Sequence, residues 1–532
     1  MTLAFEQEIP RRRPPAPPRA PSAPGATSPF IPISQRARYG VIAFVLIYQA
    51  FTPALLAVTH GIADPHVGVR MLLNAGYWIL ALLPLFFYRR DYGWLHPLIF
   101  PLLYSILQNL ATEPMMLVSP LAVLVPGPIV ELPILAGLPM ASPGDTSLAM
   151  IYTHLAKILA LACYFVGYFL LPVLPARSVP LAAPKGLEWK VLATVLVGFG
   201  ILTAFIVSRG GYAAHLTSLA FGRFRSLNVW APVTVFVTIA PYAVALWAAY
   251  RPQAARNPLF WGVAFSAAAI GFLAAASRGS IVQFLAIIGL CLVARARKIP
   301  VVQVAVALPL VFLLIGALGM VRNSAWDGGV GHVAARHGEG LSGLIDYTNR
   351  TLAARDVIMG EVPVIARVPD DVPYLKGLSY GSLVTFFIPR AVWEDKPRGA
   401  GHYYATQFLN KRDDFGGVPI GPVAEAYWNF GVAGIVGVYM LFGAFHRHLA
   451  RMVIANQQNS LTWVILAVTL VLCQPGSKAV EWVQGMSAVF ALAFLFGLLR
   501  RERRRPAMAR AGPPMRPGRA PLGARPIQPP GP

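Results

Sequence analysis

Apolar runs of about 20 residues recur along most of this chain, and they constrain its fold more than any other feature. An α-helix of that length crosses the roughly 30 Å of hydrocarbon in a bilayer. Hydrophobic residues make up 56% of the sequence and charged residues only 13%, which excludes the several soluble domains that 532 residues would otherwise predict. The sequence therefore predicts an all-α polytopic membrane protein.

The runs divide the chain into about twelve transmembrane helices, with one long loop late in the sequence. The first nine helices fall in the segment 39–320 and the last three in 419–499. The long loop, 321–418, separates the ninth helix from the tenth. Pro- and Arg-rich tails, 1–38 and 500–532, are expected to be disordered. The predicted spans are 39–60, 69–88, 94–112, 148–174, 188–208, 229–250, 258–276, 280–294, 299–320, 420–445, 461–473 and 482–499.

Basic residues sort onto one side of these spans. Arg36, Arg38, RARK at 295–298 and HRHLAR at 446–451 all fall on that side, and the positive-inside rule makes it the cytoplasm. An even number of spans then puts both termini in the cytoplasm and the long loop on the external side. The formal net charge of +23 does not indicate nucleic-acid binding, because much of the excess lies in the tails beside membrane spans.

Four arginines on the predicted external side oppose this sorting. Arg209, Arg223 and Arg225 lie in the loop 208–229, which holds no acidic residue. Arg278 lies at the tip of a hairpin between two spans. Because guanidinium groups bind phosphate oxygens in bidentate fashion, the arginines fit a pocket for phosphate or pyrophosphate. The alternative is that they reach lipid headgroups beside a span end, which we favour for Arg209.

The long loop ends in a stretch that mixes charged and aromatic side chains, FFIPRAVWEDKPRGAGHYYATQF at 386–408. Aromatic rings beside charged and hydrogen-bonding groups suit sugar rings and a charged headgroup. An ordinary structured loop whose charges pair locally explains the pattern equally well. The candidate binding residues are Arg390, Lys396, Arg398 and His402.

A glycine-rich span follows this loop and carries Glu425 near its external end. The glycines allow neighbouring helices to approach closely. The carboxylate is a candidate to orient a sugar hydroxyl, to act as a base, or to hold an arginine of the pocket, and we slightly favour the last role. His154 and Lys157, one turn apart within an earlier span, are candidates for a buried polar pair.

Other chemistry has little support in the sequence. The three cysteines fall inside predicted spans, which argues against disulfides and thiolate metal sites. His332, His337 and His402 show no metal-ligand spacing, and no P-loop is present. Neither a metal nor another cofactor is therefore expected.

Three segments of the sequence occur in the same order as similar segments in a known family. GGYAAHLTSLAFGRFRS follows a span, ASRGSIVQF forms a hairpin, and IPRAVWEDKP precedes GPVAEAYWNFGVAGIVG. Over the segment 188–451 the chain resembles the bacterial O-antigen and exopolysaccharide polymerases of the Wzy type, which join oligosaccharide repeat units. The resemblance implies a metal-independent, GT-C-like glycosyltransferase that spans the bacterial inner membrane several times, with its long loop in the periplasm.

For such an enzyme the expected substrates are oligosaccharides on undecaprenyl pyrophosphate. The growing glycan passes from its lipid carrier to a new lipid-linked repeat unit, and preorganised cations stabilise the pyrophosphate that leaves. Besides membrane lipids, a flippase and a chain-length regulator are the expected partners. Arg278, Arg223 and Glu425 are the candidate catalytic residues. The candidate substrate-binding residues are Arg209, Arg225, Arg390, Lys396, Arg398 and His402.

Three alternatives stay open at this point. An O-antigen ligase would share the topology and the donor, would transfer the glycan to the lipid A core, and would use a loop histidine with arginines. A flippase or other transporter of lipid-linked oligosaccharides would move its substrate without making a glycosidic bond, although transporters often show duplicated halves and no internal repeat is evident here. A scaffold in a polysaccharide export complex would tolerate loss of the external arginines.

Overall fold

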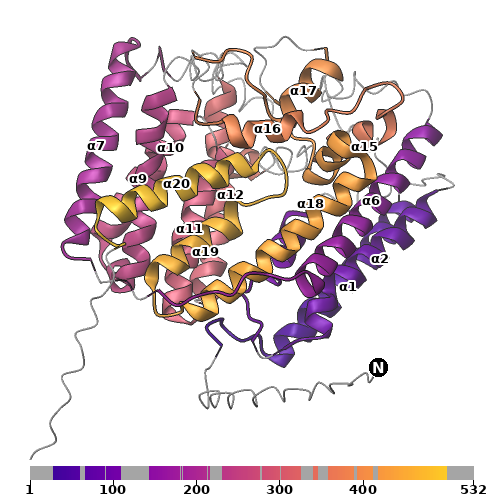
Figure 1. Cartoon of the computed structure of the whole chain (residues 1–532), viewed down its shortest axis with the longest axis horizontal. Coiled ribbons are helices and arrows are strands. Elements are labelled where there is room, and N and C mark those ends of the chain that lie inside the picture. Colours follow the sequence, from indigo (N-terminus) through magenta and orange to yellow (C-terminus); the bar gives the residue numbers. More distant parts are fainter. Residues whose placement is uncertain are drawn as a thin grey trace, which may run out of the picture.

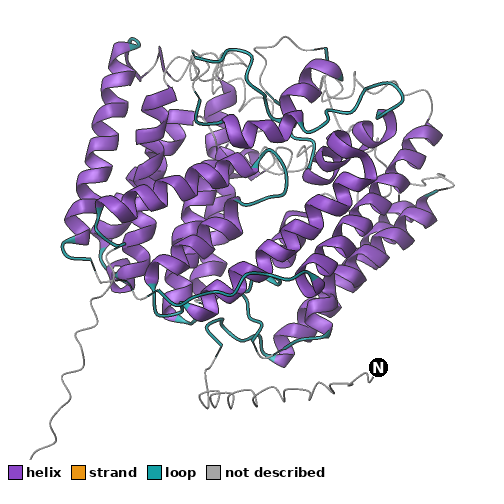
Figure 2. Cartoon of the chain, viewed as in Figure 1, coloured by secondary structure: helices purple, strands orange, loops and turns teal. Residues whose placement is uncertain are grey.

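The helices of this protein follow the apolar runs of its sequence. The computed structural model describes residues 28–59, 66–89, 91–109, 143–179, 181, 184–212, 214–215, 231–275, 278–299, 301–324, 340–345, 357–388, 392–410 and 417–499. Within these residues the fold is all-helical, and Figure 2 shows no strand. The helices are α1 (Gln35–Thr59), α2 (Val67–Phe86), α3 (Phe100–Asn109), α6 (Pro143–Leu170), α7 (Leu187–Ser208), α9 (Ala231–Tyr250), η3 (Pro252–Arg256), α10 (Pro258–Ala275), α11 (Arg278–Ala296), α12 (Val301–Ser324), α15 (Val357–Arg367), α16 (Leu378–Thr385), α17 (Ala400–Gln407), α18 (Pro422–Ala455), α19 (Ser460–Leu472) and α20 (Ala479–Leu495).

Six of the described helices are long and apolar enough to cross a membrane, by length and composition: α1, α2, α6, α7, α11 and α18. This bears out a membrane-embedded, helical fold. Each of the twelve expected spans overlaps a helix, but α19 has 13 residues and the described part of α3 has ten. At 1.5 Å per residue they measure about 20 Å and 15 Å, less than the hydrocarbon thickness of a bilayer. The number of spans therefore stays a prediction.

The helices pack in two groups that meet along α18 and α19 (Figure 1). One group consists of α1, α2, α3, α6 and α18, and the other contains α7, α9, α10, α11, α19 and α20. In the second group α9 lies at the centre, where small side chains such as Ala243 and Ala248 are completely buried. The two groups join where Leu449 and Val453 of α18 pack with Trp463 of α19.

The most extensive contact between two helices is that of α6 with α18, and two glycines make it close. A Cβ atom on Gly167 of α6 would collide with the carbonyl oxygen of Met440 in α18. A Cβ atom on Gly443 of α18 would likewise collide with the carbonyl oxygen of Tyr164 in α6. The two backbones therefore touch at a crossing that only glycine permits, as the glycine-rich sequence predicted.

The segment expected to be a long loop is helical over much of its described part, and its helices include the short α15, α16 and α17. They cover one end of the molecule, and we call this end the loop end (Figure 1). A hydrophobic cluster that includes Val364, Tyr404 and Phe408 joins α15 and α17 to Trp428 of α18, which is completely buried. The layer is thus fixed to α18 by its own core.

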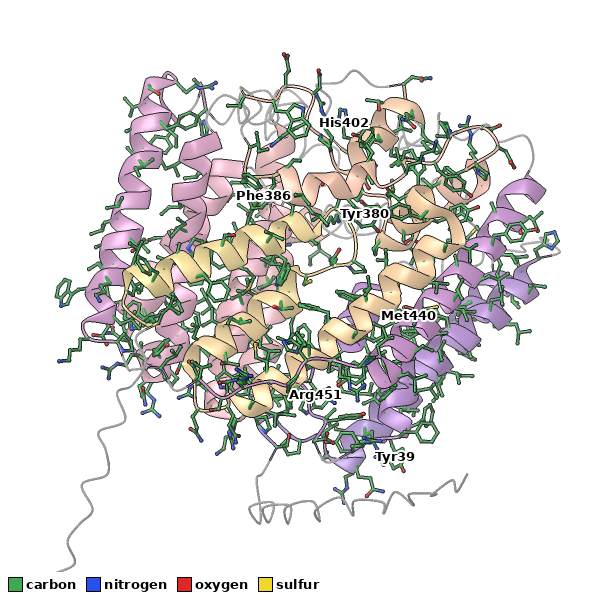
Figure 3. All side chains as sticks on the ribbon, in the orientation of Figure 1. Tyr39, Tyr380, Phe386, His402, Met440 and Arg451 are labelled. Carbon is green, nitrogen blue, oxygen red and sulfur yellow. The ribbon has the colours of Figure 1, made fainter. Side chains whose placement is uncertain are left out.

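The opposite end carries Tyr39 and Arg451, while His402 lies at the loop end (Figure 3). At this opposite end, which we call the basic end, Arg447 donates to the carbonyl oxygens of Phe169 and Leu171 at 3.0 Å each. These are carbonyls at the C-terminal end of α6, where a cation is electrostatically favourable. The basic residues near the end of α18 therefore also have a structural role.

α18 is not continuous, because its backbone breaks at Phe430 and Gly431. Gly431 has φ 65° and ψ −152°, a combination that is open only to glycine. The carbonyl of Trp428, just before the break, accepts from the N–H of Leu375 at 2.9 Å. The side chain of Asn429 donates to the carbonyl of Glu425 at 2.8 Å. The break is thus stabilised by specific hydrogen bonds, as broken helices in membranes require.

Candidate functional site

Glu425 lies in the first turn of α18, at the loop end, and is 4% exposed. Its Oε1 accepts from Ser379 Oγ at 2.7 Å and from the backbone N–H of Ser477 at 2.9 Å. The hydroxyl of Ser379 in turn accepts from Asn429 Nδ2 at 2.8 Å. A chain of hydrogen bonds therefore runs from Asn429 through Ser379 to the carboxylate.

Four helices begin around this carboxylate. Ser379 is the second residue of α16, and Glu425 itself is in the first turn of α18. Ser477 precedes the N-cap of α20, and its Oγ accepts from the backbone N–H of Ala400, the first residue of α17, at 3.3 Å. A helix N-terminus carries partial positive charge, so four of them favour a buried anion at this point. We call this arrangement the Glu425 junction.

Glycine makes the junction tight. Gly476 has φ 125°, and a Cβ atom there would lie 2.6 Å from Glu425 Oε2. A Cβ atom on Gly399 would lie 3.1 Å from Ser477 Oγ. The connection between α19 and α20 can therefore reach the carboxylate only because it carries a glycine there.

Arg398 and His402 lie next to the junction. Arg398 Nη1 is 3.1 Å from His402 Nε2 and 3.3 Å from Nδ1, and the backbone N–H of Arg398 donates to Tyr403 Oη at 3.2 Å. Gly399, which touches Ser477, follows Arg398 directly. The structure thus brings Arg398 and His402 into contact, and it places the backbone that follows Arg398 at the Glu425 junction.

Lys396 has a different role in the same segment. Its Nζ donates to the carbonyl of Ile388 at 2.7 Å, with the carbonyl of Phe386 at 3.4 Å and that of Thr385 at 3.5 Å. These carbonyls lie at the end of α16 and just after it, so the ammonium group satisfies them and opposes the negative end of the helix. Lys396 therefore makes the local contacts expected of an ordinary structured loop, which was the alternative to substrate binding.

The junction continues toward α11 through polar contacts that sequence reasoning missed. Lys478, the exposed N-cap of α20, lies close enough to act electrostatically on Glu425. One turn further, Glu481 accepts from Gln283 Nε2 of α11 at 3.4 Å. The sequence feature that could have indicated these contacts is QPGSK at 474–478, a turn between two apolar runs that places Lys478 at the start of a helix.

The remaining arginine candidates are distributed as follows. Arg278 begins α11, a little more than one turn before Gln283, and its side chain lies outside the described part of the structure. Arg209 is the C-cap of α7, with its guanidinium 5.3 Å from the ring centroid of Phe205. Substrate binding and contact with lipid headgroups both stay predictions for Arg209. Arg223, Arg225 and Arg390 lie outside the described residues, as do His332 and His337.

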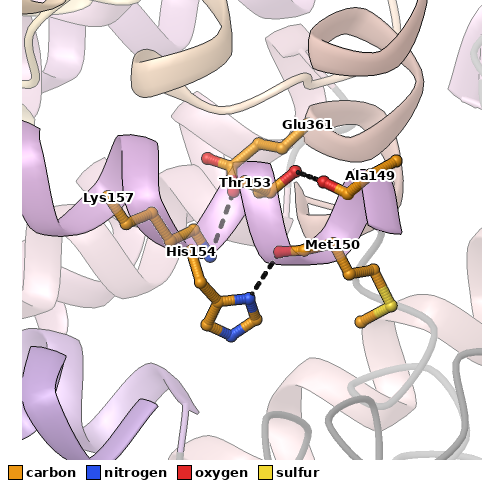
Figure 4. A network of polar contacts seen from close by, with 6 residues as sticks. All are labelled: Ala149, Met150, Thr153, His154, Lys157 and Glu361. Carbon is orange, nitrogen blue, oxygen red and sulfur yellow. Dashed lines mark hydrogen bonds and ion pairs between the residues drawn. The ribbon is translucent and has the colours of Figure 1, made fainter. Parts of the chain in front are cut away.

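A second polar cluster lies between α6 and α15. Figure 4 shows Lys157 of α6 reaching Glu361 of α15, with an ion pair of 3.1 Å, while His154 Nδ1 lies 2.8 Å from the carbonyl oxygen of Met150. His154 and Lys157 thus each have another partner, which corrects the expected pair. Burial raises the pKa of Glu361, and Lys157 offsets this only in part. A Cβ atom on Gly421, the N-cap of α18, would collide with this carboxylate.

Comparisons with protein-family models, with curated proteins and with solved structures gave no match to this chain. Function must therefore be inferred from the chain's own residues. Among the described residues, no group of three or more His, Cys, Asp or Glu side chains lies together as metal ligands do. What the described part offers is a membrane-embedded helical scaffold with a polar, partly cationic junction at one end.

Proposed function

We propose that this chain is a membrane-embedded glycosyltransferase that polymerises lipid-linked oligosaccharide repeat units. The observation that carries the proposal is the Glu425 junction, where four helix N-termini meet beside Arg398 and Lys478. Helix N-termini and guanidinium groups are the features that bind phosphate oxygens in proteins. The Glu425 junction lies at the loop end, opposite Arg451. Both lipid-linked substrates of such an enzyme would be tethered on the loop-end side of the membrane.

The proposed reaction needs the cations at its leaving group. The bond between the anomeric carbon of the growing glycan and the pyrophosphate oxygen breaks, and a hydroxyl oxygen of the acceptor sugar forms the new glycosidic bond. The electron pair of the broken bond stays on undecaprenyl pyrophosphate, and the hydroxyl proton is taken up by a base. Preorganised cations lower the barrier because they are already oriented toward the charge that develops. Two lipid-tethered substrates in one leaflet also lose little further freedom when they meet.

Glu425 suits a supporting role in this scheme. Its Oε1 already accepts two hydrogen bonds within the described part of the chain, and the group is almost fully buried. The carboxylate holds α16 and the α19–α20 connection against α18, and it thereby positions the residues around it. Arg398 and Arg278 are the cations that we assign to the pyrophosphate.

The experiment that tests the proposal is substitution of Arg278. We expect Arg278→Ala to abolish polymerisation while the protein still accumulates in the membrane, and Arg278→Lys to recover only part, because an ammonium group lacks the bidentate geometry. Gel analysis of lipid-linked glycans reports chain length. Arg297→Ala, at the other end of α11 where Arg297 contacts Gln457, is the matched control and should leave chain length unchanged. Normal chain length in Arg278→Ala would reject the assigned role.

A second candidate is transfer of the glycan to the lipid A core, and one observation favours it. His402 lies within hydrogen-bonding distance of Arg398, which is the pairing of loop histidine and arginine expected for a ligase. The acceptor decides between the two functions. Deletion of a polymerase leaves single repeat units on the lipid carrier, whereas deletion of a ligase leaves long lipid-linked chains and a bare lipid A core.

A further inference from the structure

The break in α18 places an aromatic surface directly beside the Glu425 junction. Phe430 departs from helical geometry and is 49% exposed. Its ring is nearly parallel to that of Tyr380 in α16, with 11° between the planes and 6.0 Å between the centroids. At that separation the two rings are offset rather than face to face, so they form one extended plate. Gly377 allows this contact, because a Cβ atom there would lie 3.0 Å from Phe430 Cζ.

Two buried polar atoms next to the plate lack partners in the part of the chain that the structure describes. Asn429 uses its Nδ2 for Ser379 and for the carbonyl of Glu425, while its Oδ1 has no hydrogen-bond partner there. Asn429 is only 1% exposed. Tyr380 Oη is likewise buried and without a partner. An unsatisfied buried polar group costs folding free energy, so one on a ring of the plate and one on the residue before the other ring call for an explanation.

The hydrogen-bonding chemistry of these groups limits which class of ligand could bind beside them. Asn429 Oδ1 can only accept a hydrogen bond, so it does not suit phosphate. Burial, and secondarily the charge of Glu425, raise the pKa of Tyr380, so its phenol stays protonated and can donate or accept. A hydrocarbon chain would cover the rings but satisfy neither atom. A sugar offers C–H groups to the ring faces and hydroxyls that both donate and accept.

We propose that the plate formed by Tyr380 and Phe430, with Asn429 beside it, binds a sugar ring of the lipid-linked glycan. The inference rests on the proposed function for the identity of the glycan, and it adds the place where a saccharide is recognised. Asn429 also belongs to the chain of hydrogen bonds that ends on Glu425. A sugar held there therefore adjoins the junction that carries the cations, as transfer from a pyrophosphate requires.

The test measures sugar binding directly, without polymerisation. The full-length protein in lipid nanodiscs is mixed with a panel of free hexoses, N-acetylhexosamines and 6-deoxyhexoses, and saturation-transfer NMR reports binding. We expect at least one sugar to bind. Phe430→Leu should weaken it by roughly tenfold or more, and Tyr380→Phe, which removes only the hydroxyl, by roughly tenfold. Phe265→Leu changes an aromatic residue that is 54% exposed on α10, away from the plate, and this variant should bind sugar as the parent protein does.

Two results would overturn the inference: no sugar of the panel binds, or binding survives both Phe430→Leu and Tyr380→Phe. Failure of the proposed function has a different signature. If a sugar binds through these residues but the purified protein forms no glycosidic bond from lipid-linked repeat units, the sugar site stands and the polymerase does not. If polymer forms normally and the two variants leave both sugar binding and chain length unchanged, the polymerase stands and the sugar site does not.

Discussion

Two charged side chains, Glu425 and Lys396, hold the helices of the loop end in place. Glu425 holds Ser379 and the backbone of Ser477. Lys396 satisfies the carbonyls after α16. Both were singled out in the sequence because charge stands out among apolar residues. Their contacts within the chain show that such charges also hold short helices in place, where backbone groups would otherwise stay unsatisfied.

The role of Glu425 can be tested with two substitutions. We expect Glu425→Ala to destabilise the protein by roughly 2–4 kcal/mol, because two buried donors lose their acceptor. Glu425→Gln should retain most stability and most polymerisation, since the amide oxygen can accept the same two bonds. Thermal unfolding in detergent and glycan chain length are the measurements. A Gln variant that is stable but inactive would instead assign the carboxylate to the chemistry.

Between helices, glycines decide how closely the backbones approach. Gly443 and Gly167 lie where α18 and α6 touch, whereas a Cβ atom on Gly437 of α18 would have nothing within 4 Å. The repeated glycines of this span predict close packing but not which glycine makes the contact. Only the crossing point of the two helices distinguishes them, because it fixes which face of α18 meets α6.

This difference makes a direct prediction. Gly443→Ala should lower stability by about 1–3 kcal/mol, the usual effect of an added methyl group in a fully packed contact. Gly437→Ala should be neutral or stabilising by up to about 1 kcal/mol, because alanine favours the helix where space is open. Thermal unfolding of the two variants side by side in the same detergent makes the comparison. Equal destabilisation by both would contradict the packing described for α6 and α18.

Across the molecule as a whole, the two ends differ in chemistry. Tyr39 and Arg451 lie at the basic end and His402 at the loop end (Figure 3). The positive-inside rule predicts that the basic end faces the cytoplasm. The proposed function depends on this orientation, because its lipid-linked substrates are expected on the opposite side.

Cysteine labelling tests the orientation. In a variant whose three native cysteines are replaced by alanine, we expect Asp370→Cys at the loop end to react with a membrane-impermeant maleimide in cells whose outer membrane has been permeabilised. Lys185→Cys should react only after the inner membrane is opened, because it lies in the connection whose Val179 is bound by Asn456 at the basic end. Both positions are exposed, so access alone does not separate them. The reverse labelling pattern would rule out periplasmic catalysis.

The positions of most helices could be predicted from the sequence. Apolar runs the length of a bilayer mark where they lie, since a buried backbone in lipid has few alternatives to a helix. Charge among apolar residues also identified Arg398, His402 and Glu425 as candidates. Ser379 and Ser477 gave no such signal, because a single hydroxyl or backbone N–H has no pattern in a sequence.

What these residues do together follows from the packing of the folded chain. Ser379 and Glu425 are 46 residues apart and Ser477 a further 52, yet they share one hydrogen-bonded junction. Contacts between residues so far apart in the chain depend on how the helices pack and on where α18 breaks. Neither feature produces a periodic pattern in the local sequence. The junction of four helix N-termini, and the aromatic plate beside it, therefore emerge only in the tertiary structure.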